Sequence, residues 1–258
     1  MPRPRYTEFR RRLKAREYVI GTFVKTPTSH ATEMLGGLGY DFVVIDQEHA
    51  AIDLGAIDMM VLGARASNIA GIVRVNEPSD GNILSVLDCG ASGILVPHVD
   101  SAEKAKAVAS ACRYRGGRRG FANTTRAGGF GEVSFKDHMD ASDAQVACIA
   151  MIEDLAAIER IDAIAAVPGI DAFFVGRGDL TAAIEAPSMT SAETHRLVEP
   201  IMAAARKANM PVIMLSPDRA DAEKMAKLGA TAFMVSSDHG FMKMAARQAL
   251  KDFAPPIR

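Results

Sequence analysis

The sequence predicts a single α/β domain over residues 1–258 with the (β/α)8 barrel fold, in which eight parallel strands alternate with eight outer helices. The chain has 258 residues, and barrels of this type usually need about 250. Its short apolar runs are mostly continuous rather than alternating, which indicates parallel strands that are covered on both faces. Eight such runs alternate with eight helical stretches, and this count favours a closed barrel over an open sheet.

The expected elements follow one another in a regular order. Strands are predicted at residues 19–23, 42–45, 71–75, 93–96, 147–152, 172–175, 212–215 and 232–235. Helices are predicted at residues 31–38, 54–66, 82–88, 102–112, 155–166, 192–208, 220–228 and 241–253. Four predicted helices are followed by a glycine, at Gly39, Gly90, Gly169 and Gly229. Because the residue after a helix often adopts a left-handed conformation, each glycine predicts a helix end just before a strand.

One stretch between predicted strands, residues 114–145, is much longer than the others. Its start, residues 113–120, is rich in arginine and glycine. Loops of this length inside a compact domain are usually lids, interfaces or disordered segments. The stretch could therefore reach over the barrel rim or into a neighbouring subunit, with a solvated surface loop as the alternative.

Composition indicates a small-molecule partner. The 30 basic and 31 acidic residues nearly cancel, so no broad field favours nucleic acid or an anionic membrane. No apolar run approaches the roughly 20 residues of a membrane helix, and no apolar stretch follows the arginine-rich N-terminus as in a secretory signal. Cys89, Cys112 and Cys148 form no C-x-x-C pair, so we expect reduced thiols and a cytoplasmic location.

Polar side chains follow four of the predicted strands. In chain order they are Asp46, Glu48, His49, Arg74, Glu153 and Asp179. Because the carboxyl ends of parallel barrel strands form one rim, these groups are expected to converge there. Active sites of this fold lie at that rim, so the sequence predicts an enzyme.

Glu153 and Asp179 are the predicted metal ligands. Two carboxylates at neighbouring strand ends make a hard oxygen site suited to Mg²⁺ or Mn²⁺, with Co²⁺ as a third candidate. A lone strand-end carboxylate is more often a helix cap, and Asp179 could cap a short helix. A divalent ion there could bind a 2-oxo acid and stabilise the enolate that forms when the bond between carbons 3 and 4 breaks.

His49 is the expected acid/base, because an imidazole titrates near neutral pH and can take the proton of the 4-hydroxyl. Asp46, three residues earlier, is expected to hold the His49 ring and set its tautomer. Arg74 is expected to neutralise the charge that grows on the enolate oxygen. A structural ion pair with Asp46 or Glu48 is the other role open to Arg74.

A glycine-rich turn after the sixth strand is the expected site for the substrate carboxylate. It comprises Gly176, Arg177, Gly178 and Asp179, where a strand passes into a helix. Free backbone N–H groups at such a junction favour an anion. Of the other histidines, His98 after the fourth strand is the best further candidate.

Five stretches carry a resemblance to a known family. They are GYDFVVIDQEH at residues 39–49, VRV at 73–75, GASGILVP at 90–97, MIE at 151–153 and VGRGDL at 175–180. From about residue 10 to 253 the chain resembles the HpcH/HpaI family of metal-dependent 2-oxo acid aldolases. The resemblance implies a barrel, usually a homohexamer, that reversibly cleaves an aldol to pyruvate and an aldehyde. It also implies that the last helix, at 241–253, is exchanged between paired subunits.

By the same resemblance, Glu153 and Asp179 match the metal ligands, His49 with Asp46 matches the catalytic dyad, and Arg74 matches an arginine that contacts pyruvate. Family members often have Gln at the position of Met151, and Pro followed by Ala or Ser at 177–178. The arginine at 177 is expected to add charge at the barrel mouth. The identity of the aldehyde is therefore not predicted.

Three alternatives remain open. Lys25, at the end of the first strand, could form a Schiff base with the substrate as in metal-free aldolases. A lyase acting on a CoA thioester such as malyl-CoA or citryl-CoA would need a basic nucleotide groove, for which only residues 113–126 leave room. A barrel could also bind a metal or a 2-oxo acid without turnover, because a fold does not fix a function.

Overall fold

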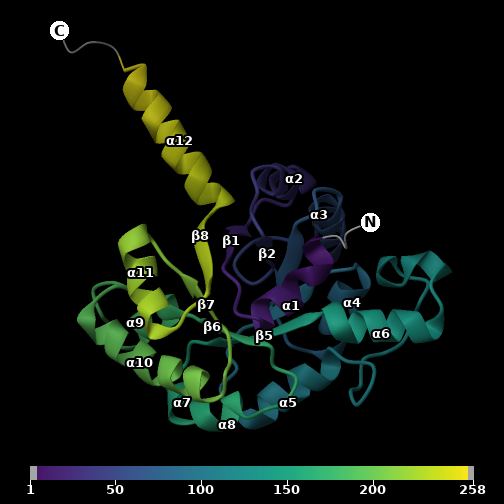
Figure 1. Ribbon diagram of the computed structural model, residues 1–258. Coiled ribbons are helices and arrows are strands. Elements are labelled where there is room, and N and C mark those ends of the chain that lie inside the picture. Colours follow the sequence, from purple (N-terminus) through teal and green to yellow (C-terminus); the bar gives the residue numbers. More distant parts are fainter. Residues whose placement is uncertain (1–4, 255–258) are drawn as a thin grey trace.

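The computed structural model describes residues 5–254, and it confirms the predicted barrel (Figure 1). Neighbouring strands are parallel, and the last strand closes the barrel against the first. The strands are β1 (Val19–Val24), β2 (Phe42–Asp46), β3 (Ala70–Arg74), β4 (Gly93–Val96), β5 (Ala147–Ile152), β6 (Ala172–Val175), β7 (Val212–Leu215) and β8 (Ala232–Ser237). All of them lie where the sequence predicted them, apart from small shifts at their ends.

Most outer helices also follow the prediction. They are α2 (Ser29–Gly37), α3 (Leu54–Ala66), α4 (Asp80–Asp88), α5 (Ala102–Ala111), α10 (Ala192–Lys207), α11 (Arg219–Leu228) and α12 (Asp238–Asp252). The helix expected at 155–166 is instead two short helices, α7 (Leu155–Glu159) and α8 (Ile161–Ala165). Arg160 separates them with φ −111° and ψ 10°. The sequence did not predict η1 (Arg5–Glu8), α1 (Phe9–Lys14), η2 (Arg126–Gly131) or α6 (Phe135–Gln145). Helix α9 (Arg177–Ala183) lies at the expected junction of strand and helix after β6.

The glycines that were expected to end helices are confirmed. Gly39, Gly90, Gly169 and Gly229 all have positive φ, between 90° and 111°. Side chains other than glycine reach this conformation only with strain, so the four positions turn the chain from a helix into β2, β4, β6 and β8 at low cost. The recurring glycine is therefore a reliable signal of the repeating unit.

Eight of the helices follow ordinary capping rules at their N-termini. A Ser, Thr or Asp side chain accepts a backbone N–H at the start of α2, α3, α4, α5, α6, α10, α11 and α12. Helix α9 instead follows Gly176, which has no side chain to cap it. Asp179 lies inside the first turn of α9 and does not cap it, so the alternative that Asp179 is a helix cap is wrong.

The long stretch at 114–145 is more ordered than a surface loop, since it contains η2 and α6. It packs near α1 and α4 (Figure 1). Arg119 is buried and donates to Asp88 at the end of α4 and to Ser142 in α6. Arg118 of the same stretch pairs with Asp80 in the first turn of α4. The stretch is therefore tied to both ends of α4, and whether it serves as a lid or an interface stays a prediction.

Helix α1 closes the amino-terminal end of the barrel. Its apolar residues Phe9 and Leu13 are buried in the same cluster as the inward-facing side chains of the strands. Arg10 of the same helix lies 2.8 Å from Asp171, a buried carboxylate just before β6. The interior of the barrel is therefore a packed core, as expected for this fold.

Two expectations from composition can be compared with the structure. Across residues 5–254, none of the helices combines the length and the apolar character that a membrane span requires. All three cysteines are free thiols, and two of them, Cys112 and Cys148, are buried. The predicted absence of disulfides is confirmed for these residues.

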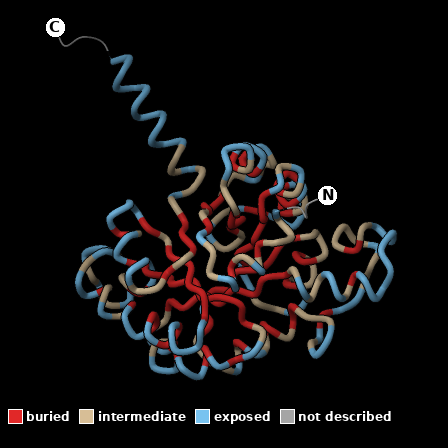
Figure 2. Tube along the Cα trace, in the orientation of Figure 1, coloured by how far each residue is buried: buried red, intermediate tan, exposed pale blue. Residues whose placement is uncertain are grey.

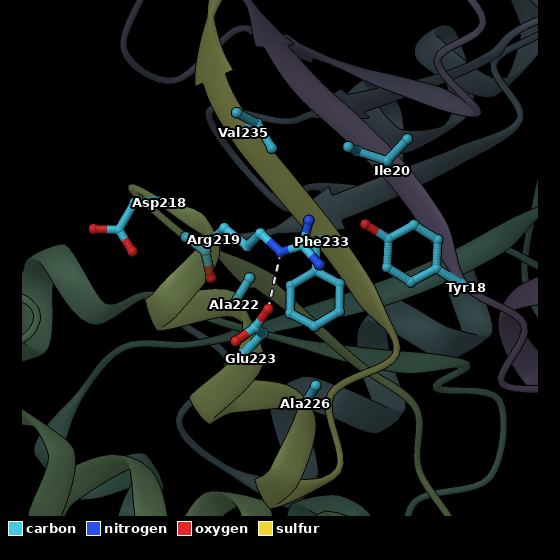
Figure 3. A pocket seen from close by; sticks show the side chains of 10 residues that line it. Tyr18, Ile20, Asp218, Arg219, Ala222, Glu223, Ala226, Phe233 and Val235 are labelled. Carbon is cyan, nitrogen blue, oxygen red and sulfur yellow. Dashed lines mark hydrogen bonds and ion pairs between the residues drawn. The ribbon is translucent and has the colours of Figure 1, made fainter.

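Helix α12 leaves the barrel instead of packing on it (Figure 1). None of its residues is buried, and Figure 2 shows the exposed helix pointing away from the core. Its apolar side chains Met242, Met244 and Leu250 are 63%, 65% and 76% exposed. The outer face of β1 and β8 beside α11 is left with a cavity of about 500 Å³, into which Tyr18, Phe233 and alanines of α11 point (Figure 3).

Candidate active site

Alternation along the strands decides which side chains reach the rim. In β2, Phe42 and Val44 lie in the cluster inside the barrel, whereas Val43 and Ile45 pack under the helices. Successive side chains of a strand point to opposite faces, so the next inward position after Val44 is Asp46. By the same count, the inward positions on other strands are Lys25, Arg74, Glu153, Gly176 and Ser236.

Lys25, Arg74, Gly176 and Ser236 line a cavity of about 330 Å³ at the carboxyl ends of the strands. The predicted residues that line it are His49, Arg74, Gly176, Gly178 and Asp179. Three further predicted residues lie behind this wall, since Asp46 and Glu48 pair with Arg74 and Glu153 packs against Gly176. All the predicted site residues are therefore brought together at one end of the barrel.

Glu153 and Asp179 come from neighbouring strands and face each other. Glu153 is only 3% exposed. Burial raises the pKa of Glu153 from its ordinary 4.5 to about 7, and the negative charge of Asp179 adds to the rise, although His98 opposes it. Two carboxylates held this close repel each other, and a cation between them would relieve the repulsion.

Gly176 has a geometric reason to be glycine. A Cβ atom built at this position would lie 2.6 Å from Glu153 Cβ, 2.7 Å from Glu153 Oε2 and 2.9 Å from Met151 Cε. Real Cβ atoms do not approach other atoms this closely, so a side chain here would push Glu153 out of place. At Gly178, by contrast, a Cβ atom would meet nothing within 4 Å. Gly176 thus allows the close approach of the β6 end to Glu153.

His98 is a site residue whose surroundings the sequence did not show. It has the unusual φ of 54° for a residue other than glycine. Its backbone N–H donates to Glu153 Oε1 at 2.8 Å, and its ring Nδ1 lies 3.2 Å from Asp154 Oδ2. Burial lowers the pKa of His98, but the charges of Glu153, Asp154 and Glu48 outweigh it and raise that pKa. His98 therefore fixes the Glu153 carboxylate.

A buried ion-pair network holds Asp46. Arg74 donates from Nε to Asp46 Oδ1 at 3.0 Å and from Nη2 to Oδ2 at 2.8 Å. Its third nitrogen, Nη1, lies 3.0 Å from Glu48 Oε2, and Lys25 Nζ lies 3.0 Å from Asp46 Oδ2. Burial opposes the ionisation of Asp46, but mainly the bonds and charge of Arg74 hold its pKa below the ordinary value. The structural ion pair open to Arg74 is present.

The His49 ring does not contact Asp46 as the sequence predicted. Asp46 Oδ1 accepts the backbone N–H of His49 at 3.1 Å, and both Asp46 oxygens are engaged by Arg74. The His49 ring instead has Nε2 at 3.7 Å from Glu48 Oε2, and its side chain is 55% exposed. The expectation that Asp46 holds the imidazole is therefore not met, because the arginine occupies the carboxylate.

Arg177 does not bring charge to the mouth of the barrel, so that expectation is wrong. Its side chain is 2% exposed, and its Nη1 and Nη2 atoms donate to Asp221 at 2.8 and 2.6 Å. Nη2 also donates to the backbone oxygen of Leu215. The guanidinium is thus neutralised inside the protein, where it joins α9 to α11.

The two rim carboxylates fit a divalent cation. Among residues 5–254 there is no group of three or more His, Cys, Asp or Glu side chains that could hold a metal ion. Mg²⁺ commonly uses only one or two protein carboxylates and takes its other ligands from waters and substrate oxygens. The pair Glu153 and Asp179, with the raised pKa of Glu153, fits that mode of binding.

Comparison with known proteins extends over almost the whole chain. The family model described as HpcH/HpaI aldolase/citrate lyase matches residues 19–245. The chain is 33% identical over 250 residues to a 5-keto-4-deoxy-D-glucarate aldolase of Klebsiella pneumoniae, covering 95% of this chain and 96% of the relative. It is 30% identical over 249 residues to a hydroxypyruvate/pyruvate aldolase of Paraburkholderia phytofirmans, covering 93% and 95%.

The fold also has a solved counterpart. An HpcH/HpaI aldolase/citrate lyase family protein from Burkholderia cenocepacia superposes with a TM-score of 0.90 at 27% identity, covering 96% of this chain and 100% of that one. The matched region includes every strand that carries a site residue. This chain therefore belongs to the HpcH/HpaI aldolase/citrate lyase family.

Proposed function

We propose that this protein is a divalent-metal-dependent aldolase that reversibly cleaves a 4-hydroxy-2-oxo acid to pyruvate and an aldehyde. The observation that carries the proposal is the pair of facing carboxylates, Glu153 and Asp179, beside a cavity that Asp179, Arg74 and His49 line. The two relatives described above are named as aldolases, which supports the same reaction class.

Glu153 and Asp179 would hold the cation, which is Mg²⁺, Mn²⁺ or Co²⁺. When bound, it would supply Lewis-acid charge to the 2-oxo acid. The first turn of α9, with Gly178 and Asp179, would receive the substrate carboxylate through its backbone N–H groups. Gly176 would keep this turn close to Glu153.

The bond that breaks joins carbon 3 to carbon 4 of the substrate. Its electron pair remains with carbon 3 of the pyruvate half, which then takes up a proton from solvent to give pyruvate, while the 4-hydroxyl oxygen becomes the aldehyde oxygen. His49, whose Nε2 lies 3.7 Å from Glu48 Oε2, would take the hydroxyl proton. Arg74, fixed by Asp46 and Glu48, would place positive charge beside the pyruvate half.

A panel of aldehydes tests the proposal. Purified protein, pyruvate and Mn²⁺ or Mg²⁺ are expected to consume at least one aldehyde, with a new 4-hydroxy-2-oxo acid detected by mass spectrometry. Excess EDTA should abolish the reaction, and added metal should restore it. Activity that survives EDTA, with a pyruvate adduct trapped on Lys25 by borohydride, would instead support the Schiff-base mechanism. Saturable binding of CoA would support a thioester lyase.

We further propose that the protein is a homo-oligomer, a hexamer by resemblance, in which α12 is exchanged between subunits. The helix exposes its apolar side chains, and the outer face of β1 and β8 lacks a covering helix of its own (Figure 3). A second copy of α12 carries the apolar surface that would fill such a gap. Sedimentation equilibrium should report an assembly larger than a monomer, and a monomer at micromolar concentration would contradict this proposal.

A further inference from the structure

The turn that carries Asp179 has little in its own backbone to hold it in one conformation. Arg177 stands between two glycines, Gly176 and Gly178, and glycine gives a backbone more freedom than any other residue. Helix α9, which starts here, is seven residues long and has no side-chain cap at its N-terminus. The position of Asp179 therefore depends on the contacts that this turn makes with other segments.

The Arg177 side chain makes such contacts with two other elements. Its Nη1 and Nη2 atoms donate to the two carboxylate oxygens of Asp221, in the first turn of α11, at 2.8 and 2.6 Å. Nη2 also donates to the backbone oxygen of Leu215 at the end of β7. A guanidinium that meets a carboxylate through two parallel bonds is fixed in orientation as well as in distance. The side chain thus ties the turn to α11 and to β7.

Both members of the ion pair are shielded from water. The side chains of Arg177 and Asp221 are 2% and 5% exposed. Burial opposes the ionisation of Asp221, but the bonds and charge of Arg177 hold its pKa below the ordinary value, so the pair is charged. Charged hydrogen bonds that water does not reach are stronger than exposed ones. The first turn of α9 is therefore held firmly against α11.

This pair is not the arrangement that would stabilise the fold most. Taking two charges out of water offsets most of their attraction, so a buried ion pair often stabilises a protein no more than two apolar side chains would. Within residues 5–254, Arg177 Nε is buried and has no hydrogen-bond partner, which adds the cost of an unpaired donor. What the guanidinium gives beyond an apolar side chain is direction, because apolar contacts do not fix an angle.

Direction matters here because Asp179 follows Arg177 by two residues in the same helical turn. Its carboxylate meets Glu153, which is held separately by the N–H of His98. We propose that Arg177, paired with Asp221, is a positioning residue that keeps Asp179 within reach of the divalent cation. The inference rests on the proposed metal-dependent function and adds the contact that holds one of the two metal ligands in place.

Replacing both members of the pair tests this role without leaving a buried charge behind. Arg177→Met combined with Asp221→Leu fills the space with apolar side chains but removes the directional bonds. In EDTA this variant is expected to unfold in urea at a midpoint close to that of the wild type. Its dissociation constant for Mn²⁺, measured by calorimetric titration of the metal-free protein, should rise about ten- to hundredfold, the usual effect of losing a group that orients a metal ligand.

The pair of Arg119 with Asp88 provides the matched control. Arg119 is also buried and donates to Asp88 at 2.9 Å, and its Nε is likewise unpaired in the part of the chain that the structure describes. Asp88 is the last residue of α4, and neither residue lines the cavity at the carboxyl ends of the strands. Arg119→Met combined with Asp88→Leu should therefore bind Mn²⁺ like the wild type.

Asp221→Asn is a milder second variant, which keeps the shape of the carboxylate but breaks the paired bonds, and it should weaken Mn²⁺ binding in the same direction. Wild-type Mn²⁺ affinity in both variants of the Arg177 pair would overturn the positioning role. An equal loss in the control variant would overturn it too, because any buried ion pair would then have the same effect. A wild type that binds no Mn²⁺ would overturn the proposed metal site itself, and the inference with it.

Discussion

Glu153→Gln is expected to remove Mn²⁺ binding and to lower kcat/KM by about a thousandfold or more. The amide keeps the size of the carboxylate and can still accept the N–H of His98, so the site should keep its shape. It lacks the negative charge that a divalent cation needs, and Lewis-acid catalysis is worth several kcal/mol. Calorimetric titration with Mn²⁺ and steady-state kinetics with an accepted aldehyde measure the two effects.

The same substitution should raise the stability of the metal-free protein. A carboxylate whose pKa is about 7 when folded and 4.5 otherwise favours its neutral form in the fold, so its ionisation costs stability as pH rises through this window. Above pH 7 the full cost is on the order of 3 kcal/mol, and below about pH 4.5 it vanishes. Urea unfolding in EDTA should therefore show Glu153→Gln to be more stable than the wild type at pH 8, with little difference near pH 4.5.

Glu159→Gln provides the control, because this glutamate is exposed on α7. It should bind Mn²⁺ and unfold like the wild type at both pH values. Unchanged Mn²⁺ affinity in Glu153→Gln would contradict the assignment of the metal site. Lower stability at pH 8 would instead show that the glutamate is held in its charged form.

His49→Ala is expected to lower turnover by about 10²- to 10⁴-fold while pyruvate and Mn²⁺ still bind. The side chain is 55% exposed, so its loss should leave the free energy of unfolding nearly unchanged. This combination separates a catalytic barrel from one that only binds its ligand. Steady-state kinetics, pyruvate titration and urea unfolding are the three measurements.

A second exposed imidazole serves as the comparison for His49. His30 lies in the first turn of α2 and bonds to Thr28 through its ring Nδ1. His30→Ala should retain wild-type turnover. If His49→Ala also turned over at the wild-type rate, the proton would have to be taken by another group, and His98 beside Glu153 would be the next candidate.

The fold could be predicted because its signals are local and repeated. Continuous apolar runs mark strands covered on both faces, and the glycines at 39, 90, 169 and 229 mark the turns before four of them. Strand ends of a parallel barrel share one rim, so polar residues that follow different strands were expected to meet. The meeting of Glu153 with Asp179 needed no further information than this.

What the sequence did not reveal depends on contacts between distant segments. Arg74, 28 positions later in the chain, donates to the Asp46 carboxylate. The short spacing between Asp46 and His49 could therefore not show whether Asp46 would bind the His49 ring. Arg177 is neutralised by Asp221 from another helix. The role of His98 depends on its positive φ, which the neighbouring residues in the sequence do not predict. It also depends on the carboxylate of Glu153, 55 positions later in the chain. The position of these residues after the strands predicted that they lie at the rim, but it did not predict their hydrogen-bond and ion-pair partners.

Helix α1 closes one end of the barrel, and this limits how a ligand can reach and leave the cavity. Phe9 and Leu13 fill the amino-terminal end of the barrel, and the packed interior leaves no passage through it. A ligand must therefore enter and leave the cavity at the carboxyl ends of the strands. For the proposed cleavage, we therefore expect the product nearer the solvent to leave before the product that lies deeper in the cavity.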